Sequence, residues 1–164
     1  MGDKIFESEC LIRFSDCDPF NHLNNSRYID YFINAREDHL LAYLNFNLYA
    51  LANEKKLGWV VTLSLIAYIK PAFLNETVVI QSMLMQVKEK EVWIEMRMWN
   101  KEKTILKSLF WSQLTHFNLV TQRSQFHSQE LHDLFKPFEN PFPTELSFED
   151  RLAFVKNKTA AELS

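Results

Sequence analysis

The strongest constraint on the fold is a change in hydrophobic period near Gly58. From Asn25 to about Leu44, apolar residues recur at helical spacing and cover one broad face, with polar residues on the other. After Gly58 the period becomes two and stays so for about sixty residues, as is typical of strands. A single long helix beside a run of strands has only a sheet on which to bury its apolar face. The pattern predicts an α+β protein in which an antiparallel sheet packs on one helix.

Strands are expected both before this helix and after Gly58. Their predicted ranges are 5–14, 61–70, 76–88, 92–99 and 104–118. The range 92–99 alternates most clearly, and its first face carries Val92, Ile94, Met96 and Met98. The range 104–118 is apolar on both faces, so we expect cover on both sides, with a partner subunit as one candidate for the second layer.

Two polar side chains, Arg36 and His39, fall inside the apolar arc of the helix. Buried charges in proteins are usually paired, and buried polar groups are usually hydrogen-bonded. We therefore expect Arg36 to be bonded to an acid or to carbonyl groups, and the His39 ring to have its partners.

The C-terminal segment, residues 119–164, is expected to extend the core. It is polar from Gln122 onward and is interrupted by several prolines. Ser147 and Asp150 stand at capping-box spacing before an apolar run, which predicts a short closing helix. Because no linker separates this segment, we expect one domain over 1–164, with a core at about 5–118 and an extension over 119–164.

Composition excludes several classes of function. A formal net charge of -3 gives no basic surface for nucleic acid, and no apolar run approaches the roughly 20 residues that cross a membrane. The only glycines, Gly2 and Gly58, cannot build a phosphate-binding loop or a dinucleotide fingerprint. The only cysteines, Cys10 and Cys17, form neither a disulfide framework nor a zinc spacing, and the first residues lack a secretory core. We expect a cytoplasmic protein.

The residues best suited to chemistry lie in segment 13–31, RFSDCDPFNHLNNSRYIDY. Asp18 stands between the end of a strand and the start of the helix near Asn25. An aspartate carboxylate is ionised at neutral pH and serves as a nucleophile or a general base. The first amides of a helix have no partners within it, so they stabilise a carbonyl oxygen that gains negative charge. A carboxylate beside a helix start therefore suggests acyl transfer.

These residues carry a family resemblance. Residues 16–31, with D-C-D-P, H-L-N-N, Tyr28 and Tyr31, resemble the 4-hydroxybenzoyl-CoA thioesterase-like family of acyl-CoA thioesterases, as do Ala35-Arg36 and Tyr68-Ile69-Lys70-Pro71-Ala72. The resemblance covers roughly 5–118 and implies the hotdog fold, a curved antiparallel sheet wrapped around one long helix. It also implies hydrolysis of an acyl-CoA to a free acid and coenzyme A, without metal or redox cofactor, in a homodimer or homotetramer with sites at the subunit junction.

The resemblance also implies roles for individual residues. Asp18, the second acid of the D-x-D pair, matches the catalytic carboxylate, and the backbone amide of Asn25 matches the group that polarises the thioester carbonyl. His22 matches a further catalytic position. The implied substrate-binding residues are Asn24 and Tyr28. Many relatives have glycine just before this histidine, whereas this chain has Asn21; asparagine is the next best residue if the position needs a positive φ.

The D-C-D-P segment is compatible with other interpretations. Asp16 and Asp18 also suit a turn that caps the helix. A dehalogenase-like phosphatase would need a parallel βαβ pattern and a later acidic pair, and a calcium loop would need oxygen and glycine where Phe20 and Asn21 stand. Two alternatives stay open: a thioesterase for acyl carrier protein, and a hotdog protein that binds an acyl group or a partner without turnover.

Overall fold

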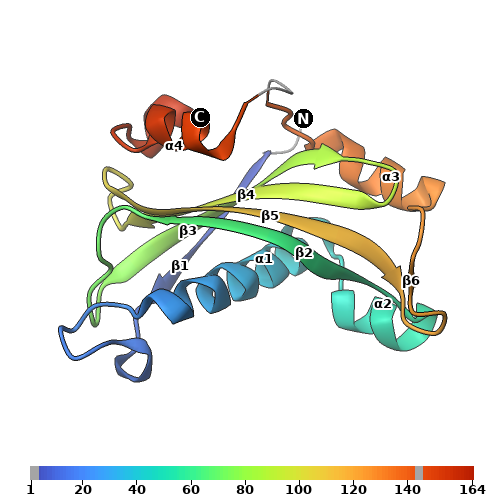
Figure 1. Cartoon of the computed structure of the whole chain (residues 1–164), viewed down its shortest axis with the longest axis horizontal. Helices are drawn as coiled ribbons and strands as arrows, with labels where there is room; N and C mark the ends of the chain where they lie inside the picture. Colours follow the sequence, from blue (N-terminus) through green and yellow to red (C-terminus); the bar gives the residue numbers. More distant parts are fainter. Residues whose placement is uncertain (1–3, 143–145) are drawn as a thin grey trace.

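The computed structural model describes residues 4–142 and 146–164. A long helix, α1, lies against one face of a curved six-stranded antiparallel sheet, and the C-terminal helix α4 lies over the other face (Figure 1). The strands are β1 (Ile5–Leu11), β2 (Leu57–Tyr68), β3 (Thr77–Val87), β4 (Glu91–Asn100), β5 (Leu106–Asn118) and β6 (Arg123–Ser124). The α-helices are α1 (Tyr28–Leu44), α2 (Leu48–Lys55), α3 (Gln129–Phe135) and α4 (Phe148–Val155). The predicted α+β architecture is confirmed.

The order of strands across the sheet is β1-β3-β4-β5-β2, and β6 pairs with the end of β5. The predicted helix begins with a 3-10 turn, Asn25–Arg27, before α1, and α1 ends where Asn45 adopts a positive φ of 49°. The first strand is shorter than expected because residues 14–16 form a separate 3-10 turn. None of the helices in the described ranges is both long and apolar enough to cross a membrane.

The inner core lies between α1 and the sheet. Phe32 of α1 is fully buried and stacks on Phe110 of β5, with ring centroids 5.2 Å apart. The face of β4 that the sequence predicted to be apolar points into this core, and Met96 and Met98 are fully buried there. Because large apolar side chains from helix and sheet fill this layer, the first half of α1 is held in place.

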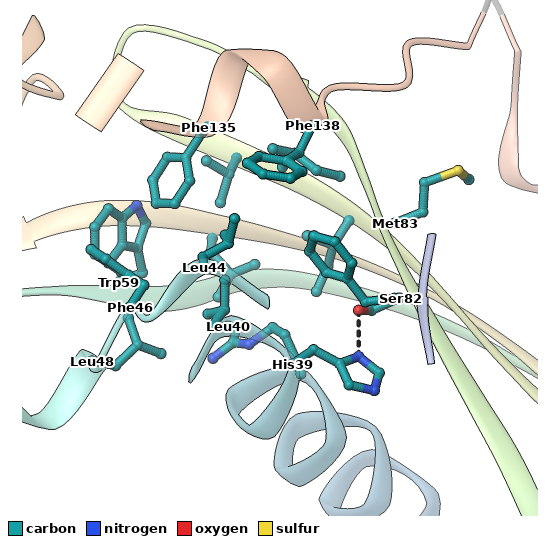
Figure 2. Close-up of a pocket in the computed structure, with 16 residues that line it drawn as sticks. His39, Leu40, Leu44, Phe46, Leu48, Trp59, Ser82, Met83, Phe135 and Phe138 are labelled. Atoms are coloured by element: carbon teal, nitrogen blue, oxygen red, sulfur yellow. Dashed lines mark hydrogen bonds between the residues drawn. The ribbon is translucent and has the colours of Figure 1, made fainter. Parts of the chain in front are cut away.

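The two polar residues in the apolar arc of α1 have different environments. The His39 ring is bonded at Nδ1 to the hydroxyl of Ser82 (2.7 Å) and at Nε2 to the hydroxyl of Ser8 (2.9 Å), as expected (Figure 2). The expectation for Arg36 is met only by a long ion pair. Its buried Nε has no hydrogen-bond partner among the described residues, and its nearest acid, Glu37, lies 3.9 Å from the other end of the guanidinium.

Burial of His39 is expected to make the protein less stable in acid. Burial lowers the pKa of His39 from an ordinary value of 6.5 to about 4, against a smaller opposite effect of Asp38 and Glu7. Between these two values the unfolded chain binds a proton that the folded chain does not, so the free energy of unfolding falls as pH drops from 6.5 to 4. The loss is at most about 3 kcal/mol, because one pKa unit corresponds to about 1.4 kcal/mol.

Urea unfolding at pH 7 and at pH 4.5 measures this loss, and the His39→Gln variant serves as the control. Because His116 and His127 are also buried with lowered pKa values, only the difference in pH slope between wild type and variant isolates His39. Equal slopes, or an NMR titration midpoint of His39 near 6.5, would contradict the prediction.

The outer core lies between the opposite face of the sheet and the C-terminal segment. Trp99, Leu109 and Trp111 on the sheet pack with Phe148 and Val155 of α4. Ser147 caps α4 by accepting a hydrogen bond from the amide of Asp150, so the predicted closing helix is confirmed. The chain's own C-terminal segment therefore supplies a second cover over β5.

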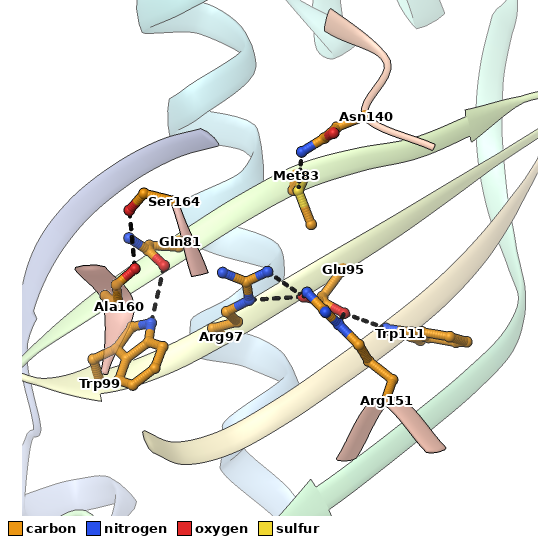
Figure 3. A network of polar contacts seen from close by, with 10 residues as sticks. All are labelled: Gln81, Met83, Glu95, Arg97, Trp99, Trp111, Asn140, Arg151, Ala160 and Ser164. Atoms are coloured by element: carbon orange, nitrogen blue, oxygen red, sulfur yellow. Dashed lines mark hydrogen bonds and ion pairs between the residues drawn. The ribbon is translucent and has the colours of Figure 1, made fainter. Parts of the chain in front are cut away.

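A buried ionic network joins this segment to the sheet (Figure 3). The Glu95 carboxylate of β4 accepts hydrogen bonds from Arg151 of α4 (2.9 and 3.0 Å), from Arg97 (2.7 Å) and from the indole of Trp111 (2.8 Å). Burial alone would raise the pKa of Glu95, but the bonds and charges of these partners outweigh burial and lower it. Glu95 thus stays ionised and ties α4 to the middle of the sheet.

Candidate active site

The loop before α1 is held together by the Asp18 carboxylate. Its Oδ1 accepts hydrogen bonds from the backbone amides of Phe20 (2.9 Å) and His22 (3.0 Å), and the Asp18 amide donates to the carbonyl of His22 (2.8 Å). The other oxygen, Oδ2, accepts no hydrogen bond from a described residue. Half-buried Asp18 therefore has one oxygen engaged in its own loop and one available for chemistry.

Asn21 allows this loop to close. Its φ is 60°, the left-handed region that glycine adopts freely and that asparagine tolerates best among the other residues. Its amide donates to the carbonyl of Asp18 at 3.0 Å, and its carbonyl accepts from the amide of Leu74 at 2.9 Å. The position thus has the positive φ for which asparagine is the best substitute for glycine.

The two acids of the D-x-D pair have different environments. Asp16 Oδ2 accepts a hydrogen bond from the hydroxyl of Tyr31 at 2.8 Å, and the same hydroxyl accepts from the amide of Arg13 at 3.0 Å. Burial raises the pKa of Tyr31 to about 12, and the Asp16 carboxylate adds to that shift. Asp16 therefore anchors the loop to α1, whereas Asp18 lines a cleft.

The start of the helix leaves one amide free. The Asn24 side chain caps the turn by accepting from the amide of Ser26 (3.0 Å), and the Asn24 carbonyl accepts from the amide of Arg27 (2.8 Å). The amide of Asn25, which lies between Asn24 and Ser26, donates to no described residue. The hydroxyl of Tyr68 donates to the carbonyl of Asn25 at 3.0 Å and so fixes the following peptide. The unpaired N–H of Asn25 is thus held in a defined position.

Asp18 and Asn25 line the same cleft, whose volume is about 230 Å³. His22 and Tyr28 line it too, so four of the five predicted site residues are brought together. Asn24 is the exception, because its side chain caps the helix start and is not among the lining residues. The other lining residues are Leu23 and the end of β2 with its following turn, Tyr68, Ile69, Lys70 and Pro71.

His22 and Tyr28 are held mainly by aromatic contacts. The His22 ring lies edge-on to Phe73 with centroids 5.1 Å apart, and the backbones of these two residues form a bridge. Tyr28 is 2% exposed, lies edge-on to Tyr68 at 5.1 Å, and accepts a hydrogen bond from the amide of Ala72 at 3.2 Å. Tyr28 therefore supports the helix start and also forms part of the cleft wall.

Two residues that build this site, Tyr68 and Lys107, have no role that the sequence predicted. Tyr68 belongs to the Tyr68–Ala72 segment of the family resemblance, which was the available signal, yet its bond to Asn25 depends on β2 lying beside the helix start. Lys107 of β5 is 5% exposed and holds the turn after β2 by donating to the carbonyl of Pro71 (2.8 Å) and by pairing with Glu76 (2.8 Å). No local pattern marks that lysine.

Cys17, between the two acids, is not suited to act as the nucleophile. Partial burial and the neighbouring Asp16 and Asp18 carboxylates raise the pKa of its thiol, and the thiol donates to the carbonyl of Arg13 at 3.3 Å. A thiol is reactive mainly as the thiolate, so Cys17 stays protonated at neutral pH. Among the residues that line the cleft, Asp18 has one carboxylate oxygen and Asn25 one backbone amide without a hydrogen-bond partner in the described residues.

Comparison with known proteins shows which protein family this chain belongs to. Residues 12–158 match the family model of the thioesterase-like superfamily. YbaW, a probable thioesterase of Escherichia coli, is 22% identical, with a TM-score of 0.70 over 82% of this chain and 98% of that chain. The DHNA-CoA thioesterase of Staphylococcus aureus is 18% identical, with a TM-score of 0.74 over 81% and 89%. The protein SAV2348 of Staphylococcus aureus, solved in complex with CoA, is 14% identical, with a TM-score of 0.75 over 90% and 91%. No curated protein matches the sequence.

A curved antiparallel sheet wrapped around one long helix defines the class of hotdog proteins. Within that class the chain belongs to the thioesterase-like superfamily and is a thioester hydrolase of the 4-hydroxybenzoyl-CoA thioesterase-like type. The match extends to residue 158, so it includes most of the extension that we expected to lie outside the resemblance.

Proposed function

We propose that this protein hydrolyses an acyl-CoA thioester to a free carboxylic acid and coenzyme A. The observation that carries the proposal is the pairing, in one cleft, of the Asp18 carboxylate with an Asn25 amide that has no acceptor among the described residues. The thioester carbonyl oxygen accepts a hydrogen bond from this amide, which stabilises the negative charge that develops when the carbonyl carbon is attacked.

Asp18 then acts in one of two ways. As a general base, it takes a proton from water while the water oxygen bonds to the carbonyl carbon; the C–S bond breaks and the coenzyme A thiolate leaves and takes up a proton. As a nucleophile, Asp18 itself bonds to the carbonyl carbon and expels the thiolate, and water then cleaves the resulting anhydride. Both routes use the unengaged Oδ2, and neither requires a metal or a redox cofactor.

The other predicted site residues have supporting roles in this proposal. His22 positions the thioester or the attacking water, Tyr28 forms part of the wall that binds the acyl-thioester unit, and Asn24 orders the turn that presents the Asn25 amide. The proposed location is the cytoplasm, and both Cys10 and Cys17 are free thiols, as a reducing compartment allows.

A substrate panel tests the carrier as well as the reaction. We expect release of thiol from at least one acyl-CoA in a set of short, long and aromatic acyl groups, with kcat/KM higher than for the same acyl groups on acyl carrier protein. DHNA-CoA thioesterase and the CoA complex among the structural neighbours favour coenzyme A as carrier. If only thioesters of acyl carrier protein are hydrolysed, the carrier is acyl carrier protein and not coenzyme A. If acyl-CoA binds but no thioester is hydrolysed, the result supports the non-catalytic alternative.

We also propose that the protein assembles as a homodimer or homotetramer through the edge of β2. This strand has one sheet neighbour, β5, and its exposed side chains include Val61 (46% exposed) and Leu63 (41%). An apolar strand edge with unpaired backbone groups favours pairing with another chain. Because Tyr68 at the end of β2 lines the cleft, such an interface lies close to the active site.

Light scattering after size exclusion tests this assembly. We expect the Val61→Lys substitution to lower the molar mass from that of a dimer or tetramer, since it places a charge in the apolar interface. Val120→Lys is the control, because Val120 is 72% exposed and lies outside β2. A monomeric wild type, or an unchanged mass for Val61→Lys, would contradict the proposal.

A further inference from the structure

The turn after β2, residues 70–76, supports the loop that carries the proposed catalytic carboxylate. The carbonyl of Ala72 accepts a hydrogen bond from the amide of Leu23 at 2.8 Å, and the amide of Leu74 donates to the carbonyl of Asn21 at 2.9 Å. The backbones of the two residues that lie between these bonds also form a bridge. The turn therefore holds the loop at successive residues.

These contacts reach the Asp18 carboxylate through one residue, His22. The backbone of His22 forms the bridge to Phe73, and its amide donates to Asp18 Oδ1 at 3.0 Å. The Asp18 amide donates in turn to the His22 carbonyl at 2.8 Å. A shift of the turn therefore moves the peptide groups that orient the carboxylate.

An ion pair ties this turn to the sheet. The ammonium of Lys107 on β5 donates to the carbonyl of Pro71 at 2.8 Å and lies 2.8 Å from Glu76 Oε1. The other oxygen of Glu76 accepts from the amide of Phe73 at 2.8 Å. The side chains of Lys107 and Glu76 are 6% and 21% exposed, so water screens their attraction only weakly. The pair thus fixes two backbone groups of the turn at once.

The ring of Phe73 gives the same pair a second path to the loop. The Lys107 ammonium lies over this ring, 5.4 Å from its centroid. The His22 ring lies edge-on to the same ring, with centroids 5.1 Å apart. Backbone and side-chain contacts therefore lead from Lys107 to the same residue of the loop.

We propose that the Lys107–Glu76 pair positions the Asp18 carboxylate for attack on the thioester. This inference rests on the proposed function of the Asp18 cleft. Neither Lys107 nor Glu76 lines that cleft, so both are positioning residues that act through the turn and through His22. Such a role affects the rate because a misplacement of about 1 Å in a reacting group can lower a rate about 100-fold.

Replacing both members of the pair tests the proposal without leaving one charge unpaired. Lys107→Met with Glu76→Gln removes the ion pair and the bond to Pro71, while the glutamine oxygen can still accept from the amide of Phe73. In acyl-CoA assays well below the unfolding temperature, kcat and kcat/KM are both expected to fall about tenfold, as for an interaction that matters in the transition state.

Hydrogen exchange measured by NMR follows the position of Asp18 without relying on turnover. The amides of Phe20 and His22 donate to Asp18 Oδ1. In the double variant they are expected to exchange about tenfold faster relative to amides in the middle of β4, which report global unfolding. Glu76→Gln alone keeps the bond from Lys107 to Pro71 and is expected to give about threefold changes in kcat and in exchange. This single variant decides the test if the double variant does not fold.

Lys103→Met with Glu7→Gln is the matched control. The two residues form an ion pair of the same types, with 2.9 Å between Lys103 Nζ and Glu7 Oε1, and neither has a hydrogen bond to the described residues of the turn after β2. Both kcat and the exchange of the Phe20 and His22 amides are expected to stay as in wild type.

The proposal is overturned if the double variant keeps the kcat of wild type, or if the control variant loses as much kcat. It is likewise overturned if exchange at Phe20 and His22 rises no more than exchange in β4, because the pair then only stabilises the fold. If wild type hydrolyses no thioester, the proposed function fails, and the exchange at Phe20 and His22 alone decides whether the pair positions Asp18.

Discussion

Replacing Asp18 by asparagine is expected to lower kcat for thioester hydrolysis by about a thousandfold, because an amide neither accepts a proton from water nor attacks a carbonyl. The fold is expected to survive. The asparagine Oδ1 can still accept from the amides of Phe20 and His22, which are the bonds that shape the loop. The measurements are steady-state hydrolysis of acyl-CoA, thermal unfolding, and binding of acyl-CoA by calorimetry.

Asp16→Asn is the matched control for this prediction. It makes the same substitution two positions earlier, at a carboxylate that accepts from Tyr31, and the asparagine oxygen can keep that bond. Turnover is expected to stay within a few-fold of wild type. If Asp18→Asn hydrolyses acyl-CoA as fast as wild type, Asp18 is not the catalytic carboxylate and the proposed mechanism fails.

Replacing Asn25 by proline is expected to lower kcat by about 10²–10³, or about 2.7–4 kcal/mol, which is the usual effect of deleting one donor to a developing oxyanion. Proline removes the N–H that the proposed mechanism requires, together with the asparagine side chain. The first position of a helical turn accepts proline well, and Asn24 before it already has the extended conformation that a following proline favours, with φ -62° and ψ 134°. The Asn25 carbonyl, which accepts from Tyr68, is retained.

Asn25→Ala is the control, since it deletes the side chain and keeps the amide. Its kcat is expected to stay near that of wild type, and both variants are expected to unfold at similar temperatures. If both variants lose kcat equally, the effect comes from the Asn25 side chain. If both keep the kcat of wild type, this amide is not the oxyanion donor.

The main elements could be predicted from the sequence because their signals are local. Alternation along β4 assigns Met96 and Met98 to one face, and this face is the one that packs on α1. The prediction of the long helix is correct for the same reason, because the spacing of its apolar residues is a local signal. The short elements α2, α3 and β6 were missed because they span between two and eight residues, too few for a period to show. Only the caps Asn47 and Ser128 mark where α2 and α3 begin.

The candidate site could be predicted in part. Asp18, His22 and Asn25 lie within eight residues of one loop, so a motif can identify them, and asparagine at position 21 is compatible with the positive φ that the loop has. The contributions of Tyr68 and Lys107 could not be predicted, because they reach the loop only after β2 and β5 pair in the sheet. The weak pairing of Arg36 was also missed. Statistics on buried charges predict a hydrogen-bonded partner, and only the packing around α1 shows that Glu37 stays 3.9 Å from the guanidinium and that Nε has no partner among the described residues.

The sequence alone determined the order of elements, the one helix with its apolar face, and the acidic loop placed before that helix, since each depends on neighbours along the chain. The tertiary structure decided which layer covers the second face of β5, which amide at the helix start stays free, and where Tyr68 and Lys107 meet the loop before the helix. These features depend on contacts between residues far apart in the chain, and hydrophobic period carries no information about such contacts.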